Sequence, residues 1–261
     1  MPRFAANIAY MFTERPLLER IGAAAKAGFP AIELQFPYEH ASAAAMKTEI
    51  ERHGVKVLGL NTPPGREGEF GLAAAAGRER EFQDQFRMAL DYIIAIGGRS
   101  VHCLAGKVAV EQRLAANSAF VANLGWAADL AKEKNIFLLI EPINTHERPD
   151  YFLWRVEHAA DIIAKVGRAN VKIQFDFYHV QIMQGDLMRR FEKFLPSIGH
   201  VQVAAVPSRH EPDEGEVNYP AIYAAIDRLG YAGFVSCEYR PRGRTEDGLG
   251  WARPYGIAPR A

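Results

Sequence analysis

The chain has 261 residues, of which 49% are hydrophobic and 24% are charged, and these are values of an ordinary globular protein. Its 31 Lys and Arg residues balance 31 Asp and Glu residues, so bulk positive charge is not available to attract a nucleic acid. No apolar run reaches the roughly 18 residues of a membrane span, and the N-terminus lacks the apolar core of a signal peptide. We therefore expect a cytoplasmic protein with no membrane and no nucleic-acid partner, whose Cys103 and Cys237 stay reduced.

Short apolar runs alternate along the chain with longer segments in which apolar residues recur at the helical period. The runs predict strands, the amphipathic segments predict helices, and glycines such as Gly54 and Gly167 stand where helices are expected to end. The predicted strands are residues 4–10, 31–37, 55–61, 100–105, 136–143, 171–177, 201–206 and 234–239. The predicted helices are residues 16–26, 41–52, 78–96, 112–134, 155–166, 187–194 and 219–229.

Strict alternation of strand and helix is typical of βα units and a parallel sheet. Eight such strands in about 240 residues match a closed (β/α)₈ barrel, the TIM barrel, in number and in length. We predict an α/β protein with one barrel domain over residues 1–261, in which the tail after about residue 241 leaves the eighth helix short or displaced. A doubly wound open sheet would carry a glycine-rich phosphate loop after the first strand, and residues 8–12 (Ile-Ala-Tyr-Met-Phe) are not such a loop.

Polar and apolar residues alternate along four predicted strands, whereas buried parallel strands usually read as continuous apolar runs. The alternation occurs in residues 32–36, 171–177, 200–203 and 235–239. Since the apolar side chains must meet the helix layer, the polar ones must face the barrel interior. There they need one another, a metal or a substrate as partners, because an unpaired buried polar group is costly. An exposed edge or a wrongly assigned strand would explain one such case but not four.

Four oxygen-bearing side chains stand at or near the C-terminal ends of four successive predicted strands: Glu141, Asp176, Gln202 and Glu238. Active sites of (β/α)₈ barrels are built on that face. Three carboxylates and one amide suit a hard divalent cation such as Mg²⁺ or Mn²⁺, whereas zinc favours Cys and several His ligands. A salt bridge or a backbone contact would explain each residue alone, but the four together predict a metal site.

Further polar residues follow predicted strands on the same face. His179 lies three residues after Asp176, and two roles fit it: a donor to a substrate oxygen, or a helix cap. Arg209 and His210 follow the seventh strand, where they either receive an anionic substrate or belong to the solvated surface.

Five segments give the sequence a family likeness: 141–144 (Glu-Pro-Ile-Asn), 176–179 (Asp-Phe-Tyr-His), 200–202 (His-Val-Gln), 215–219 (Gly-Glu-Val-Asn-Tyr) and 237–239 (Cys-Glu-Tyr). With them the chain resembles the hydroxypyruvate isomerase family, within the xylose isomerase-like barrels that include ketose 3-epimerases and endonuclease IV. The likeness runs in order over nearly the whole chain. The resemblance implies that Glu141, Asp176, Gln202 and Glu238 bind the metal and that Glu141 and Glu238 are also the acid/base pair.

One segment departs from that family. Its members resemble one another in a Pro-x-Gly-Asp-Trp segment after the third strand, followed by Gly-Glu-Arg-Gly. Here residues 63–71 (Pro-Pro-Gly-Arg-Glu-Gly-Glu-Phe-Gly) are shorter, with Phe70 in place of that arginine. A loop at this position overhangs the barrel mouth, so the change bears on the substrate more than on the chemistry. Arg66 is the candidate to take over the missing charge.

The resemblance implies an aldose–ketose type isomerase, an intramolecular oxidoreductase of carbohydrate metabolism. Its first-choice reaction interconverts hydroxypyruvate and 2-hydroxy-3-oxopropanoate (tartronate semialdehyde) through an enediolate. The metal would chelate the carbonyl and hydroxyl oxygens while one glutamate removes the proton and the other returns it. The expected partner is a small hydroxy-carbonyl acid or sugar, and a homodimer would be ordinary for a barrel.

Four alternatives use the same barrel. A 2-oxo-tetronate isomerase or a ketose 3-epimerase would use the same carboxylates, although ketose epimerases resemble one another in a His where Gln202 stands. A phosphodiesterase like endonuclease IV would need clustered histidines for three zinc ions, whereas only His102, His179 and His200 lie near strand ends. A sugar-binding barrel without catalysis would bind metal but exchange no solvent protons into a substrate.

Overall fold

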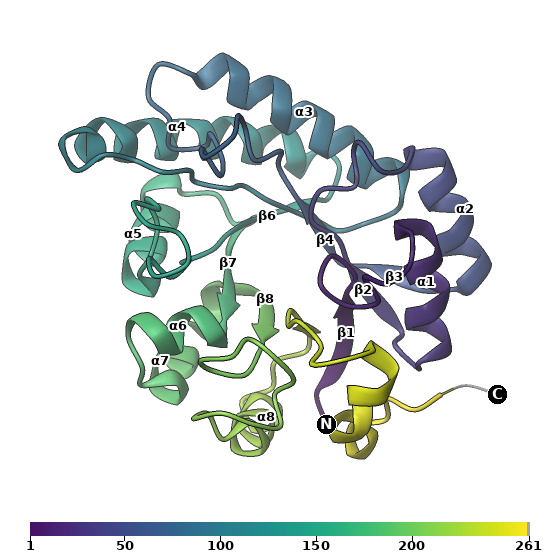
Figure 1. The fold of residues 1–261 in the computed structure, drawn as a ribbon. Coiled ribbons are helices and arrows are strands. Elements are labelled where there is room, and N and C mark those ends of the chain that lie inside the picture. The colour runs from purple at the N-terminus through teal and green to yellow at the C-terminus, as the bar shows by residue number, and fades with distance from the viewer. Residues whose placement is uncertain (260–261) are drawn as a thin grey trace.

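A computed structural model describes residues 1–259, whose strands form one parallel sheet curled into a barrel with the helices outside it (Figure 1). The strands are β1 (Arg3–Asn7), β2 (Ala31–Glu33), β3 (Lys56–Val57), β4 (Gly59–Asn61), β5 (Ser100–His102), β6 (Phe137–Ile140), β7 (Val171–Asp176), β8 (Ile198–Val203) and β9 (Phe234–Cys237). Hydrogen-bonded neighbours follow the order β3-β2-β1-β9-β8-β7-β6-β5-β4. Sequence neighbours are therefore bonded to each other from β1 to β3 and from β4 to β9, β1 is bonded to β9, and β3 and β4 stand at the two ends of this order.

The barrel closes where the predicted strand 55–61 divides into two short strands. β3 pairs with β2, β4 pairs with β5, and Leu58 joins the two pieces. The Leu58 amide donates to the Ile32 carbonyl at 2.9 Å, and the Leu34 amide donates to the Gly59 carbonyl at 3.0 Å. The segment containing β2 is thus bonded to both pieces. With β3 and β4 counted as one position, the sheet of nine strands has the eight positions of the predicted TIM barrel, and that prediction is confirmed.

The helices surround the strands and lie largely where the amphipathic segments predict them. They are α1 (Leu17–Lys26), α2 (Ala43–His53), α3 (Glu79–Ala95), α4 (Arg113–Lys132), α5 (Val156–Val166), α6 (Phe177–Met183), α7 (Leu187–Phe194) and α8 (Tyr219–Arg228), with 3₁₀ segments at Val110–Gln112, Leu195–Ser197 and Thr245–Tyr255. The Ser42 hydroxyl caps α2 by accepting from the Ala45 amide, and Gly54 and Gly167 end α2 and α5 in the left-handed conformation, as expected. Within residues 1–259, none of the helices is both long and apolar enough to span a bilayer.

The chain after β7 differs from the sequence prediction. The sequence pattern predicts no helix between residues 177 and 187, but α6 begins directly after Asp176, whose carboxylate caps it by accepting from the Tyr178 amide at 2.8 Å. The helix shows no amphipathic pattern because its first four residues, 177–180, are all buried. It carries His179 back over the end of the barrel. After β9, the last strand, the 3₁₀ segment Thr245–Tyr255 stands where a barrel of regular βα units would have an α-helix.

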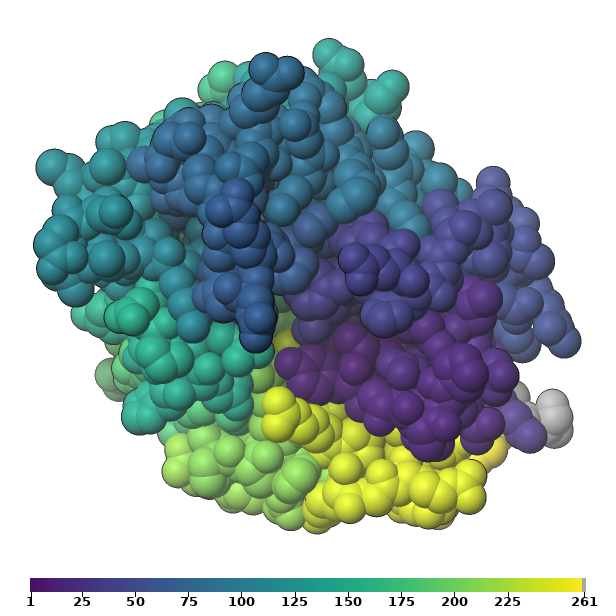
Figure 2. Space-filling view, turned by 45° about the horizontal axis from the view of Figure 1, so that its top comes forward, coloured from purple at the N-terminus to yellow at the C-terminus, as the bar shows by residue number. Residues whose placement is uncertain are grey.

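The first residues of the chain pack against α8 and the 3₁₀ segment Thr245–Tyr255, beside the pair of strands β1 and β9. The Phe4 ring lies edge-on to Tyr223 and to Trp251, with ring centres 5.0 and 5.3 Å apart. The amino group of Met1 contacts Asp227 at 2.8 Å. Figure 2 shows the purple N-terminal residues beside the yellow C-terminal residues on one face. The C-terminal segment therefore packs beside the strand pair that joins the first strand of the barrel to the last.

Both thiols are buried in the barrel wall, and burial raises the pKa of Cys103 and of Cys237 well above the ordinary value. Because the thiolate is the reactive form, we expect neither thiol of the native protein to react with dithiobis-nitrobenzoate at pH 8. After unfolding in guanidinium chloride, both of the two cysteines should react. A native thiol that reacts as fast as free cysteine would contradict the packing of these strands.

Candidate active site

The four strand-end residues that the sequence singles out lie inside the C-terminal mouth of the barrel. Glu141 directly follows β6, Asp176 ends β7, Gln202 lies in β8, and Glu238 directly follows β9. Asp176 and Gln202 stand opposite each other in the register of β7 and β8. None of the four residues is more than 4% exposed. Because parallel strands end at the same edge of a sheet, the barrel gathers residues far apart in sequence onto one rim.

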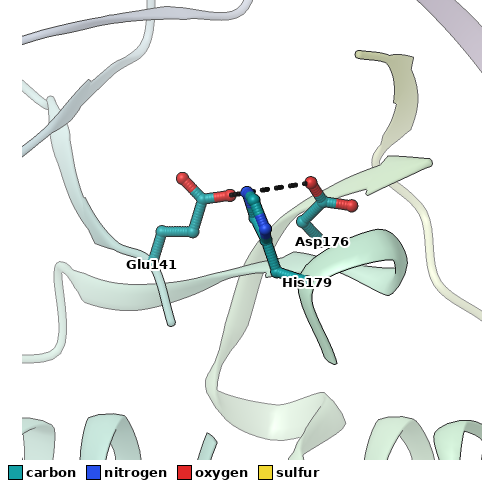
Figure 3. Close-up of side chains that lie close together, drawn as sticks. All are labelled: Glu141, Asp176 and His179. Atoms are coloured by element: carbon teal, nitrogen blue, oxygen red, sulfur yellow. Dashed lines mark ion pairs between the residues drawn. The ribbon is translucent and has the colours of Figure 1, made fainter. Parts of the chain in front are cut away.

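Glu141, Asp176 and His179 form a close cluster at this rim (Figure 3). The Nε2 atom of His179 lies 3.8 Å from Glu141 Oε1 and 3.6 Å from Asp176 Oδ2. One ligand atom from each residue lies within 4.8 Å of the others, a spacing that could hold a metal ion. His179 comes from α6, so the helix that the sequence prediction missed brings the imidazole to the two carboxylates.

Hydrogen bonds decide which nitrogen of His179 carries the proton. Nδ1 accepts from the Asn144 backbone amide at 3.4 Å, and the Asn144 side-chain nitrogen lies 2.7 Å from the same atom. The Asn144 side-chain oxygen accepts from the Glu147 amide, which turns the side-chain nitrogen toward the ring. Burial, followed by the charge of Arg209, lowers the pKa of His179 well below its ordinary value, so the ring is neutral. Its one proton is therefore on Nε2, and His179 faces the cluster as a hydrogen-bond donor.

The carboxylate of Glu238 is held by donors on both oxygens. Its Oε1 accepts from Arg209 Nη2 at 2.8 Å and from Gln35 Nε2 at 3.4 Å. Its Oε2 accepts from Asn7 Nδ2 at 2.9 Å and from the side-chain amide of Gln202. Burial raises the pKa of Glu238 well above the ordinary value, and the charge of Arg209 opposes that shift. Glu238 is thus fixed in one orientation.

Glu141 contacts neutral groups instead. Gln174 Nε2 donates to its Oε2 at 3.0 Å, and His102 Nδ1 lies 3.6 Å from the same oxygen. His102 is neutral because burial lowers its pKa to about 3. Burial and the neighbouring charges of Glu238 and Asp176 raise the pKa of Glu141 well above the ordinary value, and burial raises that of Asp176 to about 6. Both glutamates of the predicted acid/base pair hold a proton more readily than an exposed carboxyl group does.

Arg209 lies inside the site, which excludes a role as a solvated surface residue. It is 6% exposed, and its Nη1 donates to Glu147 Oε2 at 2.5 Å while Nη2 donates to Glu238. Its guanidinium carbon lies 5.0 Å from the ring centre of Tyr10 and 4.8 Å from that of Tyr178. Two carboxylates and two aromatic rings therefore surround this cation, and its charge is engaged in holding Glu147 and Glu238.

The other cations that the sequence suggests lie away from these groups. The guanidinium of Arg66 is 76% exposed, and it lies 3.7 Å from the carboxylate of Glu81 on α3. His210 is half-buried and contacts the Arg240 carbonyl oxygen through Nδ1 at 2.7 Å. Neither residue lines the cavity into which Glu141 and Glu238 open.

A second set of polar residues fills the barrel below the rim. Glu33 on β2 lies 3.2 Å from His200 Nε2 through one oxygen, and its other oxygen accepts from Gln202 Nε2 at 2.9 Å. Burial would raise the pKa of Glu33, but the contact with His200 and the hydrogen bond from Gln202 outweigh it and lower the pKa overall. The alternation along the strands indicates that these positions are polar and buried. The sequence does not indicate which of them bond to each other, because Glu33 and Gln202 are 169 residues apart.

Three oxygens at the rim are buried and have no hydrogen-bond partner in the described part of the chain: Glu141 Oε1, Asp176 Oδ2 and Gln202 Oε1. The Gln202 nitrogen is committed to Glu33 and Glu238, so the oxygen is its available end. Unpartnered buried oxygens are costly unless another group binds them. Oxygen donors of this kind are what Mg²⁺ and Mn²⁺ prefer, so the residues present fit a hard divalent cation.

A cavity of about 90 Å³ opens onto the carboxylates. Glu141, Glu238 and His179 line it, and the partly exposed Phe70 and Arg148 stand at its edge. Pockets for drug-sized ligands are far larger, at roughly 300–1,000 Å³. The cavity therefore suits a molecule of only a few heavy atoms.

The chain belongs to the xylose isomerase-like TIM barrel family, whose profile matches residues 21–255. It is 45% identical over 258 residues to the 2-oxo-tetronate isomerase of Cupriavidus necator, covering 98% of this chain and 99% of that protein. It is 38% identical to the hydroxypyruvate isomerase of Escherichia coli, covering 98% of this chain and 100% of that protein. A crystal structure described as an AP endonuclease, family 2, from Brucella melitensis has a TM-score of 0.96 at 45% identity, covering 98% of this chain and 100% of that one.

These comparisons confirm the family resemblance drawn from the sequence. They also confirm the predicted class of enzyme: the chain is an isomerase of the aldose–ketose type.

Glu33 provides a test of the polar interior. In Glu33→Gln, His200 loses its charged partner, and we expect the free energy of unfolding at pH 7 to fall by about 2 kcal/mol. Because the fold lowers the pKa of Glu33, its contribution is present above the ordinary value of 4.5 and disappears as pH falls through the native value. Urea titrations should therefore show the variant and the wild type converging toward acidic pH.

The matched control is Glu49→Gln, which removes a half-buried carboxylate 3.4 Å from His53 on α2. A pair of this kind at the protein surface contributes about 0.5 kcal/mol or less. Equal stability of Glu33→Gln and Glu49→Gln at pH 7 would contradict the stabilising role of the Glu33–His200 pair.

Proposed function

We propose that the protein is a metal-dependent isomerase of a short 2-oxo acid, which moves a proton between neighbouring carbon atoms. The observation that carries the proposal is the pair of buried glutamates, Glu141 and Glu238, which follow β6 and β9 and line the same small cavity with raised pKa values. A carboxyl group in such an environment can both take and return a proton near neutral pH.

Glu141, Asp176, Gln202 and Glu238 would hold the metal, for which we propose Mg²⁺ or Mn²⁺. The unpartnered oxygens of the first three residues support this assignment. A bound cation supplies positive charge that stabilises the enediolate form of the substrate. Both cysteines are buried in the barrel wall, and the Nδ1 hydrogen bonds place the His179 proton on Nε2, so the donor set does not favour zinc.

The chain's own side chains perform the proton transfer. One glutamate of the pair removes the proton from carbon and the other returns it at the neighbouring carbon. His179 donates its Nε2 proton in a hydrogen bond to a substrate oxygen. Arg209 holds the carboxylate of Glu238 in place through the 2.8 Å contact, so the base does not turn away from the cavity.

Two acids are candidate substrates. Hydroxypyruvate is the first choice from the family resemblance. A 2-oxo-tetronate is the second, because proteins named 2-oxo-tetronate isomerase are 40–45% identical to this chain, a range that overlaps the 38–42% of proteins named hydroxypyruvate isomerase or putative hydroxypyruvate isomerase. Both are much smaller than a drug-sized ligand, which agrees with the small size of the cavity. Epimerisation of a ketose would use the same carboxylates, but Gln202 stands where the epimerases carry a histidine. The cytoplasmic location and the homodimer stay predictions.

The acid/base pair is tested with Glu141→Gln and Glu238→Gln, which keep the size of the side chain and remove its acidity. We expect each variant to lose about 10³-fold or more in kcat with an unchanged circular dichroism spectrum. The assay is proton NMR in D₂O with Mg²⁺ or Mn²⁺, which follows deuterium entering hydroxypyruvate or 2-oxo-tetronate. Glu111→Gln changes an exposed glutamate outside the cavity and should keep full activity. Normal exchange in either site variant would overturn the assignment.

Metal dependence is tested on the wild-type protein and on Asp176→Asn. Prolonged EDTA treatment should abolish exchange, and added Mg²⁺ or Mn²⁺ should restore it. In calorimetric titrations with Mn²⁺, Asp176→Asn should bind at least about tenfold more weakly, because a carboxylate ligand becomes a neutral amide. Full activity of protein shown by mass spectrometry to be free of metal would rule the proposal out.

A further inference from the structure

Arg148 stands at the edge of the site cavity without a carboxylate partner. It follows β6 in the chain, and it lines the cavity together with Glu141 and His179. Its guanidinium carbon lies 4.4 Å from the ring centre of Phe70, and its Nη1 donates to the Glu147 carbonyl oxygen at 3.2 Å. Within residues 1–259 it makes no ion pair within 4.0 Å. Its charge nevertheless reaches the site, since it is among the causes that lower the pKa of His179.

The other arginine of the cavity is already neutralised. Arg209 pairs with Glu147 through Nη1 and with Glu238 through Nη2, so its positive charge is balanced by two carboxylates, although its buried Nε has no hydrogen-bond partner in the described part of the chain. The cavity is lined by three carboxylates, those of Glu141, Glu147 and Glu238, against two arginines. Beside the proposed metal ion, Arg148 is the lining cation without an ion-pair partner among residues 1–259, so it is the side chain free to pair with the carboxylate of an acidic substrate.

Three loops hold Arg148 in position. Phe70 lies edge-on to Tyr151 with ring centres 5.9 Å apart, so the aromatic surface beneath the guanidinium is itself packed. Residue 71 has φ of 120° and approaches the Leu104 carbonyl so closely that a Cβ would lie 2.3 Å from that oxygen, which requires glycine. Bridges from Gly71 to Ala105 and from Lys107 to Tyr151 join the loops after β4, β5 and β6. The stacked guanidinium is therefore pre-organised before a ligand binds.

We propose that Arg148, stacked on Phe70, recognises the carboxylate of the substrate and so selects a 2-oxo acid over a neutral ketose. The proposal rests on the proposed function, because it assigns a substrate class to that same site. A planar guanidinium can donate two parallel hydrogen bonds to a carboxylate, which a lysine cannot match. Phe70 then serves as the aromatic surface on which a cation from the loop after β6 is held. This role belongs to Arg148 and not to Arg66, whose guanidinium lies outside the cavity.

The test compares Arg148→Gln, Arg148→Lys and the wild type, all loaded with Mn²⁺. Calorimetry should show hydroxypyruvate or 2-oxo-tetronate binding about 10- to 100-fold more weakly to Arg148→Gln, and KM should rise by a similar factor with a smaller change in kcat. The affinity of Arg148→Lys should lie between those of the wild type and Arg148→Gln, since lysine keeps the positive charge but cannot donate two parallel hydrogen bonds. Exchange into dihydroxyacetone, in which a CH₂OH group replaces the carboxylate, should not fall in Arg148→Gln.

The matched control is Arg155→Gln. Arg155 also stacks on an aromatic ring, at 5.5 Å from the centre of Trp154, but it pairs with Glu157 and lies outside the cavity. The Arg155→Gln variant should bind the acid with the same affinity as the wild type. Melting temperatures of both glutamine variants should stay within about 2 °C of the wild type.

Each outcome decides between the two proposals. If Arg148→Gln binds the acid as tightly as the wild type, Arg148 only packs against Phe70 and the inference is wrong. The inference is also wrong if the variant loses activity on the acid and on dihydroxyacetone by the same factor. If the acid binds through Arg148 but no proton exchanges, the inference stands and the proposed function fails. If the wild-type protein binds neither acid, both are wrong.

Discussion

The crowding of carboxyl groups inside the barrel is the constraint on which the rest of the site depends. Glu33, Glu141, Asp176 and Glu238 are all buried, and like charges repel strongly in an interior of low dielectric constant. Arg209 is the one buried arginine or lysine among residues 1–259. The interior therefore cannot neutralise every carboxylate with its own cations. Amide side chains donate hydrogen bonds to some of the carboxylate oxygens, and His200 contacts Glu33. A few oxygens at the rim are left without a hydrogen-bond partner.

This incomplete balance makes the two glutamates of the pair unequal. Glu238 is surrounded by Arg209 and three amide groups, whereas Glu141 meets Gln174, a neutral imidazole and other carboxylates. Two carboxyl groups beside one substrate can exchange roles as acid and base only if their surroundings differ in this way. The same deficit of positive charge leaves room for a divalent cation at the rim. It also leaves an unpaired arginine at the cavity edge as a binding partner for an anionic substrate.

The sequence was most informative where periodicity and strand order carry the information. The alternation in residues 171–177 indicated a polar barrel interior, and the strand ends named Glu141, Asp176, Gln202 and Glu238 because the register of a parallel barrel places successive ends on one rim. Sequence reasoning was weakest beyond the strand ends. It missed α6 because that helix is buried and not amphipathic, and it placed Arg66 near the substrate when its guanidinium points to Glu81.

The sequence by itself therefore determined the barrel, the family and the set of acidic strand ends, because those follow from local patterns repeated along the chain. Only the tertiary structure decided which partners each side chain has. Asn144 orients His179, Glu33 turns Gln202, and Arg148 stacks on Phe70, in contacts between loops or strands that are distant in sequence. No local pattern encodes such pairs, since they depend on how separate βα units meet at the mouth of the closed barrel.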